Sequence, residues 1–345
     1  MASETRAVEL QANQSSHADG EYPYVRFVTN GLIAGIFISA GILANITVIT
    51  TWLRDRTRWL PLYYYFLAFA SWNLTLLTST LFFYSLPALL RQPADQSTIA
   101  CVPYFYVIGY AGANCCLTAV VWLMVVLTIE RYVAVVLPFH TRVSSPRRRA
   151  KVISTSLSVL AILYNIPLIF ELRIMSANDD HMLDNQAQNT VSTIPTYWMV
   201  DTAPFRGDFF YQTIYRVVFN LLFISLAPFV AICLLTFKIV LVVRRASAQR
   251  AVYRRPTLRH SPSDAKASIS SNSSFNHSNN AATYGNVLLT LFVVKFLICY
   301  TIPFALNVSE LFLPTEIFQT DALLWITDAS DFLVIVDSLP CPLVH

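Results

Sequence analysis

The sequence predicts an all-α membrane protein folded as a seven-transmembrane helix bundle, and three observations support this fold class. Hydrophobic residues make up 55% and charged residues 13% of the 345 residues, whereas soluble domains carry about 25% charged residues. The apolar residues gather in seven runs long enough to cross a bilayer. Basic residues concentrate in alternate loops between these runs. This composition excludes a disordered chain and argues against a soluble enzyme.

Each apolar run is expected to form one helix, because the bilayer interior offers no partners to backbone polar groups. A crossing needs about 20 residues, and the third and fifth runs exceed this length, so they extend past the membrane or tilt. The seventh run is the weakest, because three aspartates interrupt it. The expected helices cover about residues 27–53, 61–86, 102–137, 150–172, 209–243, 284–312 and 321–344.

The distribution of charge predicts which side each loop faces. Arginine and lysine gather in the loops after the first, third and fifth runs, and acidic residues gather on the other side. The positive-inside rule puts the basic loops in the cytosol, so residues 1–26 form the extracellular tail of a multi-pass plasma-membrane protein. Residues 244–283 are basic and then rich in serine and asparagine, and are expected to be a disordered third intracellular loop.

The sequence shows none of the residue patterns of an enzyme. It contains no pairing of a nucleophile with a base and no phosphate-binding loop, and its six cysteines lack the spacing of a zinc site. A net charge of +4 is too small to indicate nucleic-acid binding. We therefore expect no enzymatic activity, no cofactor, no metal centre and no nucleic-acid partner.

The inner end of the third run carries a charged motif, Glu130-Arg131-Tyr132, followed by Pro138 and Phe139. A charged pair at this depth is also explained by side chains that reach the lipid headgroups. In a chain with seven spans, however, the motif resembles the E/D-R-Y motif of rhodopsin-like (class A) G-protein-coupled receptors. The resemblance implies that these five residues couple the receptor to a heterotrimeric G protein.

Further fragments follow in the order and spacing of that family. Asn45 stands in the first run, Leu67-Ala68-Phe69-Ala70-Ser71 sits where the family writes L-A-x-x-D, and Pro228 matches the proline of helix five. In the sixth run Phe296-x-x-Cys299-Tyr300, followed by Pro303, resembles F-x-x-C-x-x-P, with one extra residue before the proline. Each fragment is weak alone, and their order makes the resemblance specific over nearly the whole chain.

Three other pieces are similar to invertebrate receptors for FMRFamide-type neuropeptides. They are Tyr84-Ser85-Leu86-Pro87, Val121-Trp122-Leu123 with Val125, and Leu163-Tyr164-Asn165-Ile166-Pro167 with Phe170-Glu171. The resemblance implies a receptor that binds an extracellular peptide and activates a G protein across the lipid bilayer. Two alternatives stay open, a receptor-like decoy that does not signal and a transporter, although the chain lacks the internal repeats of many transporters.

Acidic residues in the outer half of the bundle are candidates for ligand binding, because intramembrane acids are functional candidates by default. Asp328 and Asp331 are three residues apart and share a helix face, and Glu310 lies near the outer end of the sixth run. If the peptide ends in Arg-Phe-amide, an acid would receive the arginine in a bidentate pair, and Tyr110 and Asn114 would frame the aromatic end. The alternatives are exposure of Asp328 at the rim and packing of the aromatic residues in the core.

The resemblance also implies a switch. In the family, the arginine equivalent to Arg131 is held at rest by its acidic neighbour, here Glu130, and faces the G protein after helix six swings outward. Pro303 is the expected hinge of this motion. Tyr300, rather than Thr301, is the expected switch residue.

Helices two and seven depart from the family pattern. Ser71 replaces the helix-two acid that holds sodium, and Asp337 stands where helix seven usually has asparagine. Asp337 is therefore expected either to hold sodium from the opposite wall of the polar cavity or to be protonated and bonded to Asn45 or Ser338. The helix-seven motif N-P-x-x-Y is reduced to a stretch around Pro342, where the sequence stops, which we interpret as truncation or heavy divergence.

Two expectations concern the outer side. Cys101 lies near the outer end of helix three, but residues 173–208 contain no cysteine, so the disulfide of the family cannot form within this pair of segments. Its loss removes a constraint usually worth about 2–4 kcal/mol, and the outer loop is expected to be mobile. Asn13 begins an Asn-x-Ser sequence in the outer tail and is a predicted glycosylation site.

Overall fold

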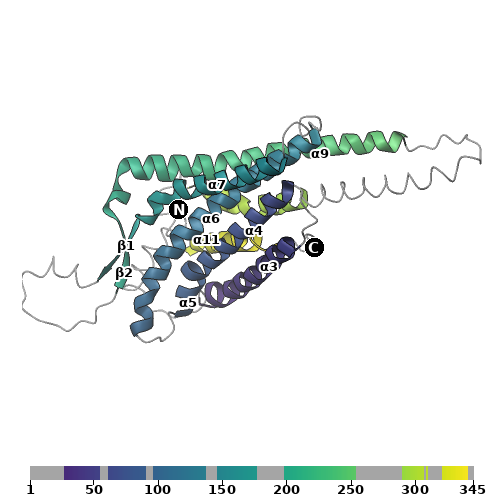
Figure 1. Cartoon of the computed structure of the whole chain (residues 1–345). Coiled ribbons are helices and arrows are strands. Elements are labelled where there is room, and N and C mark those ends of the chain that lie inside the picture. The colour runs from purple at the N-terminus through teal and green to yellow at the C-terminus, as the bar shows by residue number, and fades with distance from the viewer. Residues whose placement is uncertain are drawn as a thin grey trace, which may run out of the picture.

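The computed structural model describes residues 27–54, 61–90, 96–136, 146–176, 198–253, 290–306, 308–309 and 321–340. Within these residues the chain forms a bundle of long helices with one small β-hairpin at its outer end (Figure 1). The helices are Phe27–Ile33 continued by α3 (Ala34–Arg54), α4 (Pro61–Thr80) continued by Leu81–Ser85 and α5 (Leu86–Leu90), α6 (Gln96–Val136), α7 (Pro146–Ile169), Tyr211–Phe219 and Leu221–Leu226 continued by α9 (Ala227–Tyr253), Thr290–Leu306, and α11 (Asp321–Asp337).

Five helices of the described chain are long and apolar enough to cross a membrane, and the helix Thr290–Leu306, called the sixth helix below, is apolar but shorter. The second span is the helix from Pro61 to Leu90, the fifth span runs from Tyr211 through α9, and α11 is the seventh helix. Large apolar side chains on these helices point outward, among them Ile36, Leu43, Ile108 and Ile298, each at least 64% exposed. Such a surface is stable against lipid tails and unfavourable in water. The expected all-α membrane bundle is confirmed.

Helix α6 is the central element of the bundle, because it packs against α4, α7 and α9. The largest cluster of buried side chains lies around its inner half and includes Tyr65 and Phe69 of α4, Met124 and Leu127 of α6, and Phe296 of the sixth helix. Helix α4 in turn packs against α3 and α7. The arrangement gathers residues from five spans around the inner half of α6.

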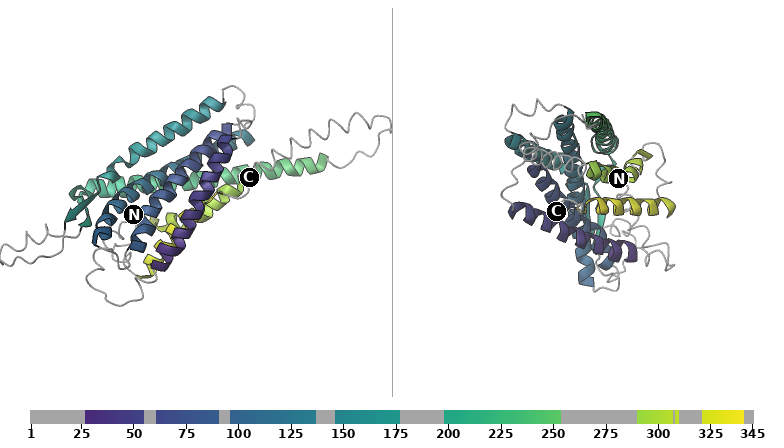
Figure 2. Two further views of the ribbon diagram at one scale, coloured as in Figure 1. Left: turned by 60° about the horizontal axis from the view of Figure 1, so that its bottom comes forward. Right: turned by 90° about the vertical axis from the view of Figure 1, so that its right-hand side faces the viewer.

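Helix α9 differs from the expected boundary of the third inner loop. It continues to Tyr253, so residues 244–253 are helical rather than disordered (Figures 1 and 2). The stretch after Val243 contains alanine, arginine and glutamine, which favour helix, and has no proline or glycine before Tyr253. The remainder of the predicted loop lies outside the described residues, as does the N-terminal tail with Asn13.

Gly109 of α6 lies against the backbone of the second span. A Cβ atom at this position would lie 2.7 Å from Cβ of Phe83, 2.8 Å from the carbonyl oxygen of Ser79 and 2.9 Å from the backbone nitrogen of Phe83. Gly112, one turn further, would meet the Ser79 hydroxyl at 2.7 Å instead. The backbone contact at Gly109 is rigid, whereas a hydroxyl can rotate away.

Gly109→Ala is therefore expected to lower the free energy of unfolding by about 1–3 kcal/mol, the usual cost of overpacking. Gly112→Ala is the matched control and is expected to cost less, because the Ser79 side chain can adjust. Thermal unfolding of the two purified variants in detergent measures the difference. Equal losses of stability in both would contradict the backbone contact.

Candidate functional site

At the inner end of α6, Glu130 is held by two other helices. Its Oε1 accepts a hydrogen bond from Nη2 of Arg149 on α7 at 2.5 Å and one from the hydroxyl of Tyr65 on α4 at 3.2 Å. The carboxylate therefore connects α6 with α4 and α7. In the sequence, Arg149 is one of a group of basic residues that only indicated orientation.

Arg131 faces a different side of α6. It lines a small cavity of about 20 Å³ with residues of α6, α9 and the sixth helix, namely Thr128, Val135, Thr236, Ile239, Thr290 and Val293. In this structure the Glu130 carboxylate contacts Arg149 and Tyr65. The pairing of Glu130 with Arg131 in the resting receptor stays a prediction.

The remaining residues of the coupling motif are only partly visible. The ring centre of Tyr132 lies 6.0 Å from Nζ of Lys238 on α9, at the edge of the range for a cation–π contact. Pro138 and Phe139 lie outside the described residues.

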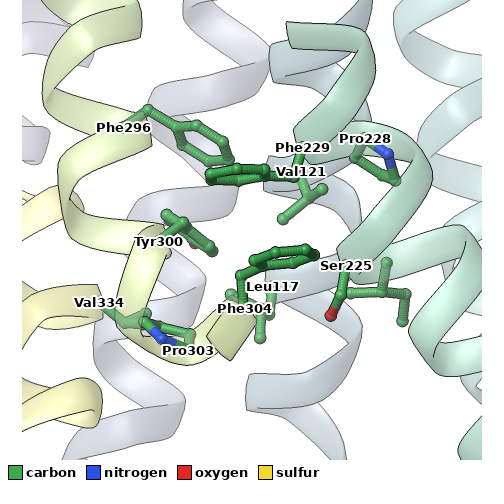
Figure 3. A pocket seen from close by; sticks show the side chains of 11 residues that line it. Leu117, Val121, Ser225, Pro228, Phe229, Phe296, Tyr300, Pro303, Phe304 and Val334 are labelled. Carbon is green, nitrogen blue, oxygen red and sulfur yellow. The ribbon is translucent and has the colours of Figure 1, made fainter. Parts of the chain in front are cut away.

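An aromatic cavity of about 50 Å³ lies between α6, the fifth span and the sixth helix (Figure 3). Tyr300 is buried and stacks on Phe296 with 4.1 Å between the ring centres, and Phe304 stacks on Phe229 of α9 at 4.5 Å. Pro303 lines the same cavity. Thr301, by contrast, is exposed, so the extra residue before Pro303 leaves Tyr300 as the residue that faces the bundle.

A second cavity of about 100 Å³ lies between the second span, α6 and α11. Asn114 and Asp331, both proposed from the sequence as ligand-binding residues, line it together with Thr80 and Ser338. Asp328, one turn further out on α11, is 8% exposed, which argues against its alternative placement at an exposed rim. Glu310 lies outside the described residues.

A buried charged cluster lies between the outer ends of α6, α7 and the fifth span. Glu171, which follows α7, is 0% exposed and accepts a hydrogen bond at 2.6 Å from Nη1 of Arg216, itself 6% exposed. Nε of Arg206 lies 3.4 Å from the same carboxylate oxygen, and the hydroxyl of Tyr110 approaches the other at 3.5 Å. Burial raises the pKa of the Glu171 carboxyl, although the Arg206 guanidinium acts in the opposite direction.

The outer segment after α7 forms an antiparallel hairpin of β1 (Leu172–Ser176) and β2 (Trp198–Thr202). Arg173 pairs with Asp201 across it at 2.6 Å, and the backbone nitrogen of Ala203 donates to the carbonyl oxygen of Glu171 at 2.9 Å. These described parts are regular structure rather than the mobile loop expected from the missing disulfide. Backbone pairing joins the two strands, and the Glu171 cluster connects this outer segment to α6 and the fifth span.

The polar residues of the inner half differ from the expected set. Ser71 is exposed and donates to the carbonyl oxygen of Leu67 at 2.8 Å, so it does not face the bundle. The buried polar residue of this stretch is Asn73, which is 3% exposed. Phe69-Ala70-x-x-Asn73 has the same spacing as L-A-x-x-D, and the match to helix two therefore shifts by two residues.

Asn45 ties the first span to the seventh. Its side-chain Nδ2 donates to the carbonyl oxygen of Ser338 at 3.0 Å and to that of Gly41 at 2.9 Å. The ammonium of Lys295 on the sixth helix lies 3.9 Å from Oδ1 of the Asp337 carboxylate. Pro342 lies outside the described residues.

Several functional candidates were missed from the sequence, and most of them are basic. Arg216 and Lys295 each interrupt an apolar run, and ionisable residues inside a membrane span are functional candidates regardless of sign. In the described residues no group of three or more potential metal-binding side chains occurs.

Comparison with known proteins agrees with this arrangement. Residues 44–344 match the family "7 transmembrane receptor (rhodopsin family)". The chain is also 24% identical over 308 residues to the FMRFamide peptide receptor frpr-18 of Caenorhabditis elegans, covering 88% of this chain and 62% of that receptor. The match to the family extends over most of the chain and includes the motifs of helices three and six. This chain is a member of the rhodopsin family of seven-transmembrane receptors, a multi-pass plasma-membrane protein and not an enzyme.

Proposed function

We propose that this receptor binds an extracellular amidated peptide of the FMRFamide type and activates a heterotrimeric G protein. The observation that carries the proposal is the cavity of about 100 Å³ between the second span, α6 and α11, which Asp331 and Asn114 both line. A carboxylate in such a place suits a guanidinium, because an arginine–carboxylate pair is bidentate and charge-assisted.

The name of the relative from Caenorhabditis elegans supports the choice of peptide class. Arg131 supports G-protein coupling, because it lines the inner cavity among α6, α9 and the sixth helix. Movement of the sixth helix would enlarge this cavity and open it to the cytosol. The two cavities share α6, which supplies Asn114 to one and Arg131 to the other, so a ligand in the first cavity contacts the helix that carries the proposed coupling residue.

The first test is a screen of amidated peptides with guanine-nucleotide exchange as the readout. A peptide ending in Arg-Phe-amide is expected to activate, and Asp331→Asn is expected to raise its half-maximal concentration about 10- to 100-fold, since a charge-assisted hydrogen bond contributes about 1.5–3 kcal/mol. The same peptide with neutral citrulline in place of arginine is expected to have nearly the same half-maximal concentration on the wild-type receptor and on Asp331→Asn.

Asp201→Asn, in the exposed hairpin pair, is the control for a change of outer charge and is expected to leave the potency nearly unchanged. An equal loss for the arginine and citrulline peptides in Asp331→Asn would rule out a direct pair. Failure of every amidated peptide to bind would overturn the peptide assignment.

A further inference from the structure

A cation and a carboxylate meet between the sixth and seventh helices. Nζ of Lys295 lies 3.9 Å from Oδ1 of Asp337 and donates hydrogen bonds to the carbonyl oxygens of Asp337 at 2.8 Å and Leu339 at 2.6 Å. The side chain of Asp337 is 3% exposed and that of Lys295 is 25% exposed. One ammonium thus makes three contacts with the end of α11.

The end of α11 is rich in carbonyl oxygens that need donors, because two prolines follow it. Pro340 and Pro342 have no N–H, so the carbonyl oxygens of Val336 and Ser338 lack their usual donors four residues on. The Val336 oxygen accepts from the backbone nitrogen of Leu339 at 3.2 Å instead.

The Ser338 oxygen accepts from Asn45 of the first span at 3.0 Å. The carboxyl end of a helix also carries partial negative charge, which a nearby ammonium stabilises. Lys295 therefore caps α11 from a neighbouring helix.

A sodium ion does not fit this arrangement. The ammonium of Lys295 already supplies positive charge beside Asp337 and donates hydrogen bonds to two of the surrounding carbonyl oxygens, which are then not available to a sodium ion. Ser71, the expected contributor from helix two, faces away from the bundle. Asn45 donates to Ser338 and Gly41 rather than to the Asp337 carboxyl, so neither of the two expectations for Asp337 describes the contact that the structure shows.

We propose that Lys295 and Asp337 form a latch that holds the sixth helix against the seventh in the resting receptor and takes the place of a sodium ion. Lys295 is eight residues before Pro303, which is about 12 Å along the helix toward its inner end. It therefore lies on the segment that moves if the sixth helix bends at Pro303. The latch must break for that segment to swing outward, so removing it favours the open state.

This inference rests on the proposed function only in taking the outward swing of the sixth helix as the step that activates a G protein. Its test therefore includes a readout that needs no G protein. Spin labels on the exposed positions Val152 of α7 and Leu291 of the sixth helix report the distance between their inner ends in the purified full-length receptor. The other cysteines that react with the label are replaced by serine. Basal nucleotide exchange is measured in parallel on the unlabelled receptor.

Lys295→Met is expected to shift the label distances toward longer values and to raise basal exchange several-fold, both without added agonist. Lys295→Arg keeps the positive charge and is expected to retain the wild-type distances. Lys151→Met is the matched control, because this exposed lysine lies on α7, with its Nζ 4.8 Å from the ring centre of Tyr64, and is not part of the latch. Replacing sodium chloride by an organic chloride salt is expected to leave the wild-type distances unchanged.

The proposal is overturned if folded Lys295→Met keeps the wild-type distances, or if sodium shortens the wild-type distances in a way that Asp337→Asn abolishes. If Lys295→Met does not fold, Asp337→Asn decides, because it removes the charge and leaves the backbone carbonyls, and unchanged distances there refute the latch. Longer distances without any exchange, with or without peptide, support the latch and contradict the proposed G-protein coupling.

Discussion

Glu171→Gln is expected to lower the free energy of unfolding of the receptor by about 3–5 kcal/mol, the usual cost of removing one partner of a buried ion pair. The substitution removes the carboxylate that neutralises Arg216, and neither side chain of this pair is more than 6% exposed. Arg206 and Tyr110 contact the same carboxylate and lose its negative charge as well. The expected result is a large fall in the melting temperature of the purified receptor in detergent.

Asp201→Asn is the matched control for this prediction. It removes the carboxylate of a pair at the same distance, 2.6 Å, but the side chains of Arg173 and Asp201 are 45% and 37% exposed. Pairs exposed to solvent contribute about 0–1 kcal/mol, so the melting temperature is expected to change little. A similar loss in both variants would show that the burial of Glu171 is not what makes its pair important.

The second large effect concerns signalling. Arg131→Ala is expected to reduce agonist-stimulated nucleotide exchange at least about tenfold, corresponding to about 1.4 kcal/mol, while peptide binding persists. Arg131 lines the cavity between α6, α9 and the sixth helix, at the end remote from the proposed ligand site. Binding and exchange are measured on the same membranes, so that loss of folding is distinguished from loss of coupling.

Arg149→Ala provides the comparison, because Arg149 lies on α7 and contacts Glu130 rather than the inner cavity. This variant is expected to retain agonist-stimulated exchange. If Arg131→Ala signals as well as the wild type, the coupling role assigned to Arg131 is wrong. If the wild-type receptor binds peptide and promotes no exchange, the decoy alternative is correct.

Helix two shows why the site was harder to predict than the fold. The motif match put Ser71 in the polar core, but Asn73 is the buried residue. A shift of two positions turns a helix by about 200°, since each residue advances it by about 100°, and so moves a residue from the core to the lipid face. Apolar runs do not reveal such an error, because lipid-facing and core-facing residues in a membrane span are both hydrophobic.

The partners of the buried charged residues were also harder to predict than the fold. Lys295 and Arg216 both interrupt apolar runs, which makes them functional candidates, but nothing in the sequence pairs them with Asp337 and Glu171. The Lys295 contact spans 42 positions in the chain and the Asn45 contact with Ser338 spans 293. Such partners depend on how each helix is rotated and tilted against its neighbours.

The amino-acid sequence by itself predicted the apolar runs and their orientation, because the length of an apolar run and the charge of its flanking loops act locally against the bilayer, and its motifs indicated the receptor family that the comparison shows. Only the tertiary structure decided that Glu130 contacts Arg149, that Glu171 joins two arginines and that Lys295 caps α11. A buried charge takes whichever partner the packing of the helices brings within a few ångströms. That packing is a property of the whole bundle.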